Sequence, residues 1–70
     1  MKTYKTNRAI INPTRAEKKA LDKKLTALNV FIGTDVYEEL PFAERERLTR
    51  QSWAMAEYSA ILEARILAFE

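Results

Sequence analysis

The 70-residue chain contains no cysteine and no histidine, and each absence removes a class of chemistry. Without cysteine, the chain forms no disulfide and offers no thiolate to a metal ion or a substrate. Without histidine, it lacks the commonest general base and the commonest neutral metal ligand. Folds this small usually gain stability from disulfides, a bound metal or partner subunits. Partner subunits are the source that remains.

Glycine occurs once and proline twice, so the chain cannot build a glycine-rich phosphate loop. No apolar run reaches 18 residues, so we expect no membrane span, and no secretory signal is visible. The paired carboxylates at 38–39 and 44–46 have the pattern of solvated charge rather than of an acid–base pair in a cleft. Ser52 and Ser59 have no base at a useful helical spacing. The sequence predicts no enzyme, no cofactor and no metal site.

Charge is distributed unevenly along the chain. Residues 1–24 contain eight Lys or Arg and two Asp or Glu, a net charge of +6, whereas residues 25–70 contain four Arg and eight Asp or Glu, a net charge of −4. The basic third either holds a negatively charged ligand or pairs head-to-tail with the acidic part of another copy. A third interpretation is solvated surface. Nucleic acid is not an expected partner, because such a segment gives only salt-sensitive affinity.

The chain is predicted to form one all-helical domain, an antiparallel hairpin preceded by a short arm. The basic arm covers residues 1–12, the first helix 13–32, the link 33–40 and the long second helix 41–69. Both helices are expected to begin at a proline, because proline is favoured in the first turn of a helix and disfavours helix in the residue before it.

Short polar motifs mark the predicted helix ends. Thr14 and Glu17 have the spacing of a capping box, although Asn12 is an alternative cap. Gly33 stands where a helix C-cap requires a positive φ. Thr34 and Asp35 are then candidate N-caps for whatever helical turn follows.

The apolar pattern predicts a hairpin that needs copies of itself. Leu21, Leu25, Leu28 and Ile32 form one stripe on the first helix, and Leu48, Ser52, Met55, Ser59, Leu62, Ile66 and Phe69 form a heptad-like seam on the second. From residue 53 onward, the second helix is apolar or small on most other sides too. A helix that is apolar around its circumference is buried around its circumference. We therefore expect a symmetric homo-oligomeric bundle, the alternative being a monomer with the arm folded over the exposed part.

Six residues are predicted at the interface between copies: Trp53, Met55, Tyr58, Leu62, Ile66 and Phe69. Large aromatic and aliphatic side chains of this kind anchor protein interfaces. Trp53 is assigned here as an interface or core anchor rather than as a platform for a nucleobase, because its sequence neighbours are largely apolar.

Ligand candidates come from the basic third and from one late arginine. Arg8 and Lys23 supply cations for phosphate, Thr26 a hydroxyl, and Tyr4 an aromatic ring on which a base can stack. Arg65 lies among apolar residues, an unfavourable place for an unpaired charge. It either pairs with an acidic residue of a neighbouring copy or faces a phosphate in a pocket between subunits.

A family resemblance rests on a series of short segments. They are Glu17-Lys18-Lys19-Ala20-Leu21-Asp22-Lys23-Lys24-Leu25, Phe31-Ile32, Leu40-Pro41, Gln51, Met55, Tyr58, Ile61-Leu62, Arg65-Ile66 and Phe69. Over residues 8–69 the chain resembles small phage and prophage proteins with a helical-hairpin domain seen in a crAss-like phage family. It is similar to the phage sponges that defeat CBASS and Thoeris immunity.

The resemblance implies an oligomer, often a hexamer, that captures a cyclic nucleotide messenger between protomers without cleaving it. The expected ligand is a cyclic di- or trinucleotide or a cyclic ADP-ribose isomer, and the expected location is the cytoplasm of the infected bacterial host. In anti-CBASS sponges a Tyr and a Lys hold cyclic dinucleotides, and the leucine register places Ile11 and Thr26 at those positions here. A second kind of sponge pocket uses Arg and Thr from three protomers, which Arg65 with Thr26 would supply.

A function of another class is also compatible with the sequence. The chain would then be a helical interaction module that binds a host or phage protein. Its anchors would be Trp53, Tyr58 and Leu67 on the late helix.

Overall fold

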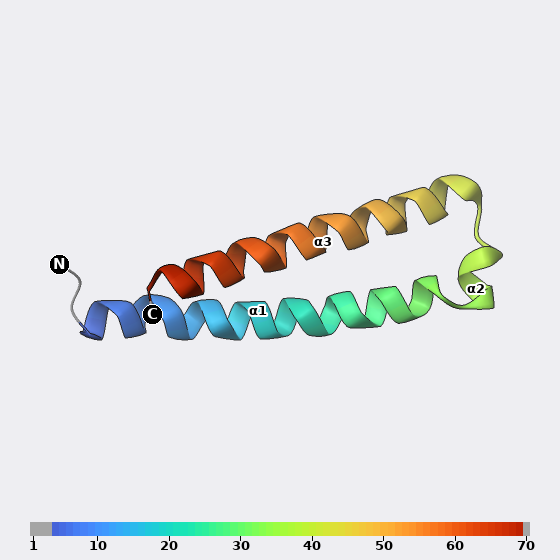
Figure 1. The fold of residues 1–70 in the computed structure, drawn as a ribbon. Coiled ribbons are helices and arrows are strands. Elements are labelled where there is room, and N and C mark those ends of the chain that lie inside the picture. The colour runs from blue at the N-terminus through green and yellow to red at the C-terminus, as the bar shows by residue number, and fades with distance from the viewer. Residues whose placement is uncertain (1–3, 70) are drawn as a thin grey trace.

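The computed structural model is an antiparallel pair of long helices joined by one short helical turn (Figure 1). It describes residues 4–69, with side chains from residue 8 onward. Helix α1 spans Tyr4–Ile32, α2 spans Asp35–Glu38 and α3 spans Phe42–Ala68. The predicted all-helical hairpin is therefore confirmed.

The basic arm predicted over residues 1–12 is wrong where the structure describes it; residues 1–3 lie outside the described range. Helix α1 begins at Tyr4, so Pro13 lies inside the helix instead of in its first turn. An interior proline removes one backbone hydrogen bond. Ile11 and Thr14, on either side of it, are both buried, and α3 is the one long element packed against α1. Burial of these two side chains favours a helix that continues through the proline.

Thr14 consequently does not start a helix. Its hydroxyl donates to the carbonyl of Ile10 at 2.7 Å, within α1, so the predicted capping box with Glu17 does not form. The alternative cap, Asn12, also lies inside α1, with an exposed side chain. A hydroxyl that bonds the carbonyl one turn back is a common arrangement for threonine inside a helix.

The turn that follows α1 at Gly33 is tighter than predicted. Gly33 does not take a positive φ. Its N–H donates to the carbonyl of Val30 at 3.1 Å, and the N–H of Thr34 donates to that of Phe31 at 3.0 Å. These bonds reach back three residues, which tightens the last turn and removes the need for a left-handed residue. Of the two candidate caps, Thr34 caps the next turn: its hydroxyl accepts from the N–H of Tyr37 at 3.3 Å, and Asp35 is the first residue of α2.

The contact between α1 and α3 follows the predicted seam. All seven seam residues of α3 are buried or half-buried, namely Leu48, Ser52, Met55, Ser59, Leu62, Ile66 and Phe69. Leu62 is fully buried, with 0% of its surface exposed. The seam also contains polar contacts, because Ser59 bonds Asp22 and the Ser52 hydroxyl donates to Asn29 at 2.6 Å. These bonds set the register of the two helices.

The hairpin is an elongated rod that leaves much apolar surface uncovered. It measures 53 × 15 × 12 Å and has a radius of gyration of 16.1 Å, whereas a compact chain of this length has about 11 Å. It exposes 5395 Å², about 900 Å² more than a compact monomer of its mass. The exposed large apolar residues are Val30, Val36, Phe42, Trp53, Tyr58, Ile61 and Leu67. Within the described range, neither long helix carries an apolar stretch that would cross a bilayer.

Replacing Gly33 with alanine is expected to stabilise the hairpin. A Cβ at this position would lie 3.5 Å from the Val30 carbonyl oxygen, an ordinary van der Waals contact. Alanine would therefore restrict the unfolded chain without straining the folded one, raising the free energy of unfolding by about 0.4–1 kcal/mol. Urea unfolding at a fixed protein concentration measures this. Gly33→Pro is the control and should destabilise, because it removes the N–H that bonds Val30; a destabilised Gly33→Ala variant would contradict the tight-turn geometry.

Candidate functional site

The ligand residues predicted from the sequence do not form one site in a single chain. Tyr4 begins α1, and its side chain lies outside the described residues. Arg8, Lys23 and Thr26 are exposed at different levels of α1, and Arg65 is exposed in the last turns of α3.

The helix register shows how far apart two of these residues lie. The bonds from Ser59 to Asp22 and from Ser52 to Asn29 place Thr26 level with the middle of α3. Arg65 is therefore about ten residues further along, or about 15 Å at the helical rise. The pairing of Arg65 with Thr26 was predicted between protomers, and within one chain the two residues lie apart.

The predicted interface between copies is corrected in part. Leu62 and Ile66 are buried inside their own hairpin, because the seam that faces α1 is filled by the same chain. Met55 and Phe69 are half-buried in that seam. Trp53 and Tyr58 remain exposed and available to a partner or a ligand.

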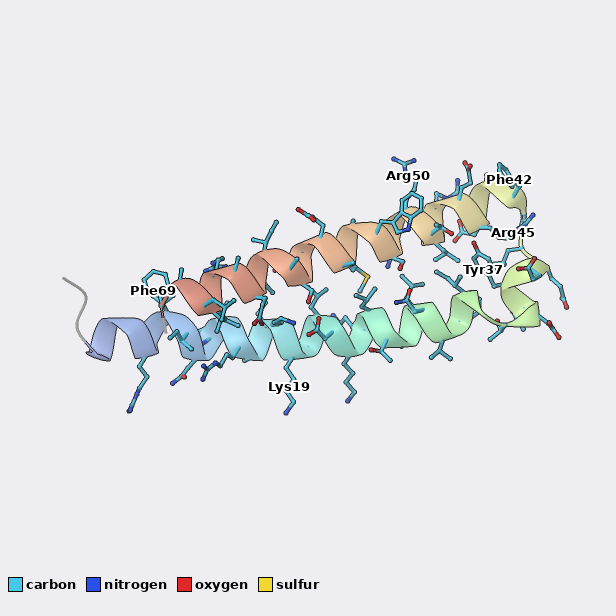
Figure 2. The ribbon with its side chains drawn as sticks, in the orientation of Figure 1. Lys19, Tyr37, Phe42, Arg45, Arg50 and Phe69 are labelled. Atoms are coloured by element: carbon cyan, nitrogen blue, oxygen red, sulfur yellow. The ribbon has the colours of Figure 1, made fainter. Side chains whose placement is uncertain are left out.

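The basic side of α1 carries two shallow cavities. One, of about 420 Å³, is lined by Arg8, Ile11, Asn12 and Arg15. The other, of about 410 Å³, is lined by Arg15, Lys18, Lys19, Asp22, Glu63 and Ile66. Figure 2 shows Lys19 pointing away from α3 into solvent. Neither lining includes an aromatic ring, so both cavities offer charge for an anion but no stacking surface.

Lys18 is not a free cation in this surface. Its Nζ donates to Asp22 Oδ2 at 2.7 Å and to Ser59 Oγ at 3.1 Å, and the Ser59 hydroxyl donates to Asp22 Oδ1. The hydrogen bond from Lys18, with a second from Ser59, holds the pKa of Asp22 below its ordinary value of 3.8. The hydrogen bond to Asp22 raises the pKa of Lys18 above 10.5. The triad joins α1 to α3 and is a structural feature.

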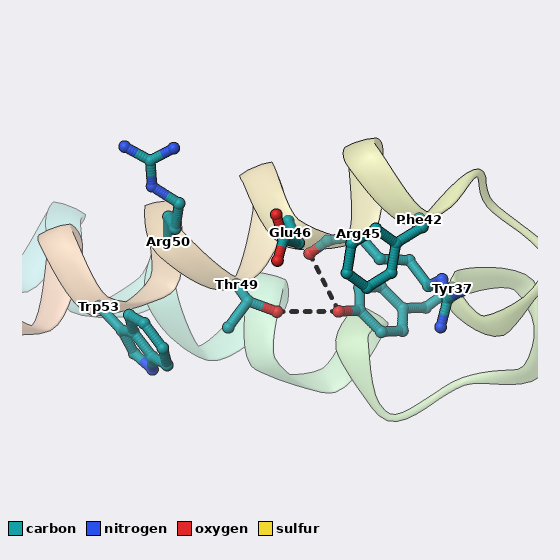
Figure 3. A pocket seen from close by; sticks show the side chains of 7 residues that line it. All are labelled: Tyr37, Phe42, Arg45, Glu46, Thr49, Arg50 and Trp53. Carbon is teal, nitrogen blue, oxygen red and sulfur yellow. Dashed lines mark hydrogen bonds between the residues drawn. The ribbon is translucent and has the colours of Figure 1, made fainter.

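A third cavity lies at the loop end of the hairpin (Figure 3). It has a volume of about 310 Å³ and is lined by Tyr37 of α2 and by Phe42, Arg45, Glu46, Thr49, Arg50 and Trp53 of α3. It combines three aromatic rings with two guanidinium groups.

The floor of this loop-end cavity is held rigidly. The Tyr37 hydroxyl donates to the carbonyl of Arg45 at 3.0 Å and lies 2.8 Å from the hydroxyl of Thr49. The Tyr37 ring meets Phe31 edge to face, with 6.3 Å between centroids. These contacts fix a buried tyrosine between α1, α2 and α3.

Arg45 is also held in place. Its Nε donates to the carbonyl of Leu40 at 3.2 Å, and its Nη1 lies 3.8 Å from Glu38. Its guanidinium lies over the ring of Phe42, 5.7 Å from the centroid. Arg50 makes no hydrogen bond or ion pair within residues 8–69, and Figure 2 shows it pointing away from α1.

The loop-end cavity was missed by the sequence analysis, although one signal was present. Phe42, Glu46, Thr49 and Trp53 recur at i, i+4, i+7 and i+11, so they share a second face of the long helix. The contribution of Tyr37 depends on the path of the link, which the sequence pattern does not specify.

The molecule is thus a small helical hairpin with a basic first helix and an aromatic cavity at its loop end. A family model for Sequestin matches residues 15–68, and the chain belongs to the Sequestin family. The family name indicates sequestration and specifies no ligand. The matched range contains every residue of the loop-end cavity but not Arg8. No curated protein and no solved structure matches the chain.

The triad of Lys18, Asp22 and Ser59 should make the hairpin sensitive to acid. Because the pKa of Asp22 is lowered by folding, its contribution to stability is present above 3.8 and is lost as the pH falls through the folded value. Asp22→Asn should therefore destabilise the hairpin at neutral pH, and its deficit relative to wild type should shrink below pH 3.8. Ser59→Ala, which removes one of two hydrogen bonds to Asp22, should show a smaller effect in the same direction.

Urea unfolding followed by circular dichroism over a pH series measures both variants. A deficit of Asp22→Asn that stays constant from neutral to strongly acidic pH would contradict the role of the triad.

Proposed function

We propose that the protein sequesters a cyclic nucleotide messenger of bacterial defence, of the CBASS or Thoeris type, without cleaving it. The observation that carries the proposal is the Sequestin match over residues 15–68. The protein would act in the cytoplasm of an infected bacterial host, where these messengers are made. Capture of this kind is stoichiometric and requires a binding site but no catalytic group.

The surface chemistry supports a ligand that carries phosphate. Arg8, Lys19 and Lys23 are exposed on α1, and arginine and lysine bind phosphate through charge-assisted hydrogen bonds. Aromatic rings are exposed on α3, at Phe42 and Trp53. Nucleobases of any type stack on such rings.

Self-association is part of the proposal. The hairpin exposes about 900 Å² more surface than a compact monomer of its mass. In a standard protein interface, each partner buries about 800 Å², so the excess is of the same size. A symmetric bundle of copies, with a hexamer as the expected form, would cover the outer faces of α3. It would also let Arg65 of one copy approach Thr26 of another.

Light scattering after gel filtration tests the assembly. We expect a mass several times the 8.1 kDa of one chain, near six times for a hexamer. Ile61→Asp and Leu67→Asp place a charge on exposed apolar positions of α3 and should lower that mass while helical circular dichroism is kept. Val30→Asp, at an exposed position of α1, is the matched control. A chain that stays at 8.1 kDa at high protein concentration would contradict assembly.

Calorimetry tests the ligand. Cyclic dinucleotides, cyclic trinucleotides and cyclic ADP-ribose isomers are titrated into the full chain, and we expect saturable binding of at least one with no product formed. Heating the complex should return the intact ligand, identified by mass spectrometry. A double variant, Arg8→Ala with Lys23→Ala, should weaken binding about tenfold or more, because two charge-assisted phosphate contacts are lost. Absence of heat across the whole panel would contradict the function.

A second candidate function is favoured by the exposed anchors of α3. Trp53, Tyr58 and Leu67 are all exposed in the single chain, and residues of this kind bind partner proteins. The protein would then be an interaction module for a host or phage protein. A complex that assembles with one purified protein partner, and that releases no nucleotide on heating, would favour this function over sequestration.

A further inference from the structure

We propose that the loop-end cavity is a nucleotide subsite, in which a nucleobase stacks on Trp53 and its phosphate binds Arg50. The inference rests on the proposed function and assigns it a site. Neither Arg45 nor Arg50 was among the ligand residues predicted from the sequence.

The residues that line the cavity match the chemistry of a nucleotide. Of the three cavities described above, only this one combines aromatic rings with arginine. Phe42 and Trp53 are 65% and 69% exposed, so their rings are open to solvent instead of packed inside the hairpin. An exposed ring beside a guanidinium matches a ligand that is planar at one end and anionic at the other.

Part of the cavity lining is held in place before any ligand binds. Tyr37 is buried, and its hydroxyl is fixed by Arg45 and Thr49. Arg45 is held against the Leu40 carbonyl and the Phe42 ring, so its guanidinium is already positioned beside the cavity. A site whose floor is fixed before binding loses less conformational entropy when the ligand arrives.

The cavity combines residues held by hydrogen bonds, such as Tyr37 and Arg45, with charged residues that have no such contact in the described range. Arg50 and Glu46 line the cavity without any hydrogen bond or ion pair in the described part of the chain. Arg50 is therefore available to a phosphate, and the Glu46 carboxylate can accept a hydrogen bond from a ribose hydroxyl or a base amine. Two arginines and one glutamate line the cavity, and Glu38, outside the lining, pairs with Arg45, so Arg50 is the cation left for a phosphate.

Size limits what the cavity takes. Its volume of about 310 Å³ is at the lower end of the range for small-molecule sites, about 300–1,000 Å³. It therefore suits one nucleotide unit. The remainder of a cyclic di- or trinucleotide would lie beyond the opening.

The sequence offers a direct reporter, because Trp53 is the only tryptophan of the chain. The full chain is titrated with AMP, with adenosine and with inorganic phosphate while tryptophan emission is recorded. We expect AMP to change the emission saturably, adenosine to do so more weakly, and inorganic phosphate alone to have little effect. AMP should also compete with whichever cyclic nucleotide binds in calorimetry.

Variants locate the site. Trp53→Ala should weaken AMP binding in calorimetry roughly 5- to 150-fold, the loss of one stacking contact, whereas Trp53→Phe should stay near wild type. Arg50→Ala should weaken it about tenfold. Arg47→Ala is the matched control, because it removes an exposed arginine from the same helix outside the cavity lining and should leave AMP binding unchanged.

The outcomes separate the subsite from the function. Nucleotide binding that is unaffected by Trp53→Ala and Arg50→Ala would overturn the subsite and leave sequestration standing. The same holds if Arg47→Ala abolishes binding and Arg50→Ala does not. If no nucleotide of either panel binds, both the subsite and the proposed function are overturned. If AMP binds as described and the cyclic panel does not, the subsite stands and the messenger class is wrong.

Discussion

A hairpin of two helices can bury only one face of each, and this geometric limit governs the rest of the structure. In α3 the covered face is the seam, where Leu62 is fully buried. The opposite faces still carry Trp53, Ile61 and Leu67, which remain largely exposed. At about 25 cal/mol per Å² of apolar surface, such exposure is a substantial source of free energy for whatever covers it. The described chain has no further long helix to cover these faces. They are therefore left open to a ligand or a partner.

The polar contacts of the seam matter for the same reason. A purely apolar seam between two long helices leaves the register weakly defined, whereas hydrogen bonds specify one pairing. Here Ser59 with Asp22 and Ser52 with Asn29 set that pairing. At the loop end, local contacts with Arg45, Thr49 and Phe31 hold Tyr37 beneath the first turns of α3.

The sequence predicted those features of the fold that depend on helical periodicity alone. The seam from Leu48 to Phe69 was read correctly because a stripe at steps of three and four is a direct consequence of 3.6 residues per turn. The helix starting near Pro13 was wrong, because a proline and a capping motif are local signals of about 1–3 kcal/mol. They were outweighed by burial of Ile11 and Thr14 against a helix that lies far away in the sequence.

The candidate site was less predictable than the fold. Four of the ligand residues were chosen by charge and residue type, and the structure places them at different levels of the two long helices. They are Arg8, Lys23 and Thr26 of α1 and Arg65 of α3. The loop-end cavity depends on a buried tyrosine in the link and on two arginines in a segment that is acidic in total. Net charge over a long segment therefore concealed a surface on which arginine lies beside aromatic rings.

Trp53 was assigned to an interface, and its exposure is compatible with two occupants, a ligand or another copy. The two are not exclusive. The loop-end cavity holds about 310 Å³ and is open on one side, so a ligand larger than one nucleotide unit would leave part of itself in water. A second copy placed beside that opening would bury both the ring and the protruding part of the ligand. Release would then require separating copies as well as unstacking a base, and assembly would slow dissociation from the proposed subsite.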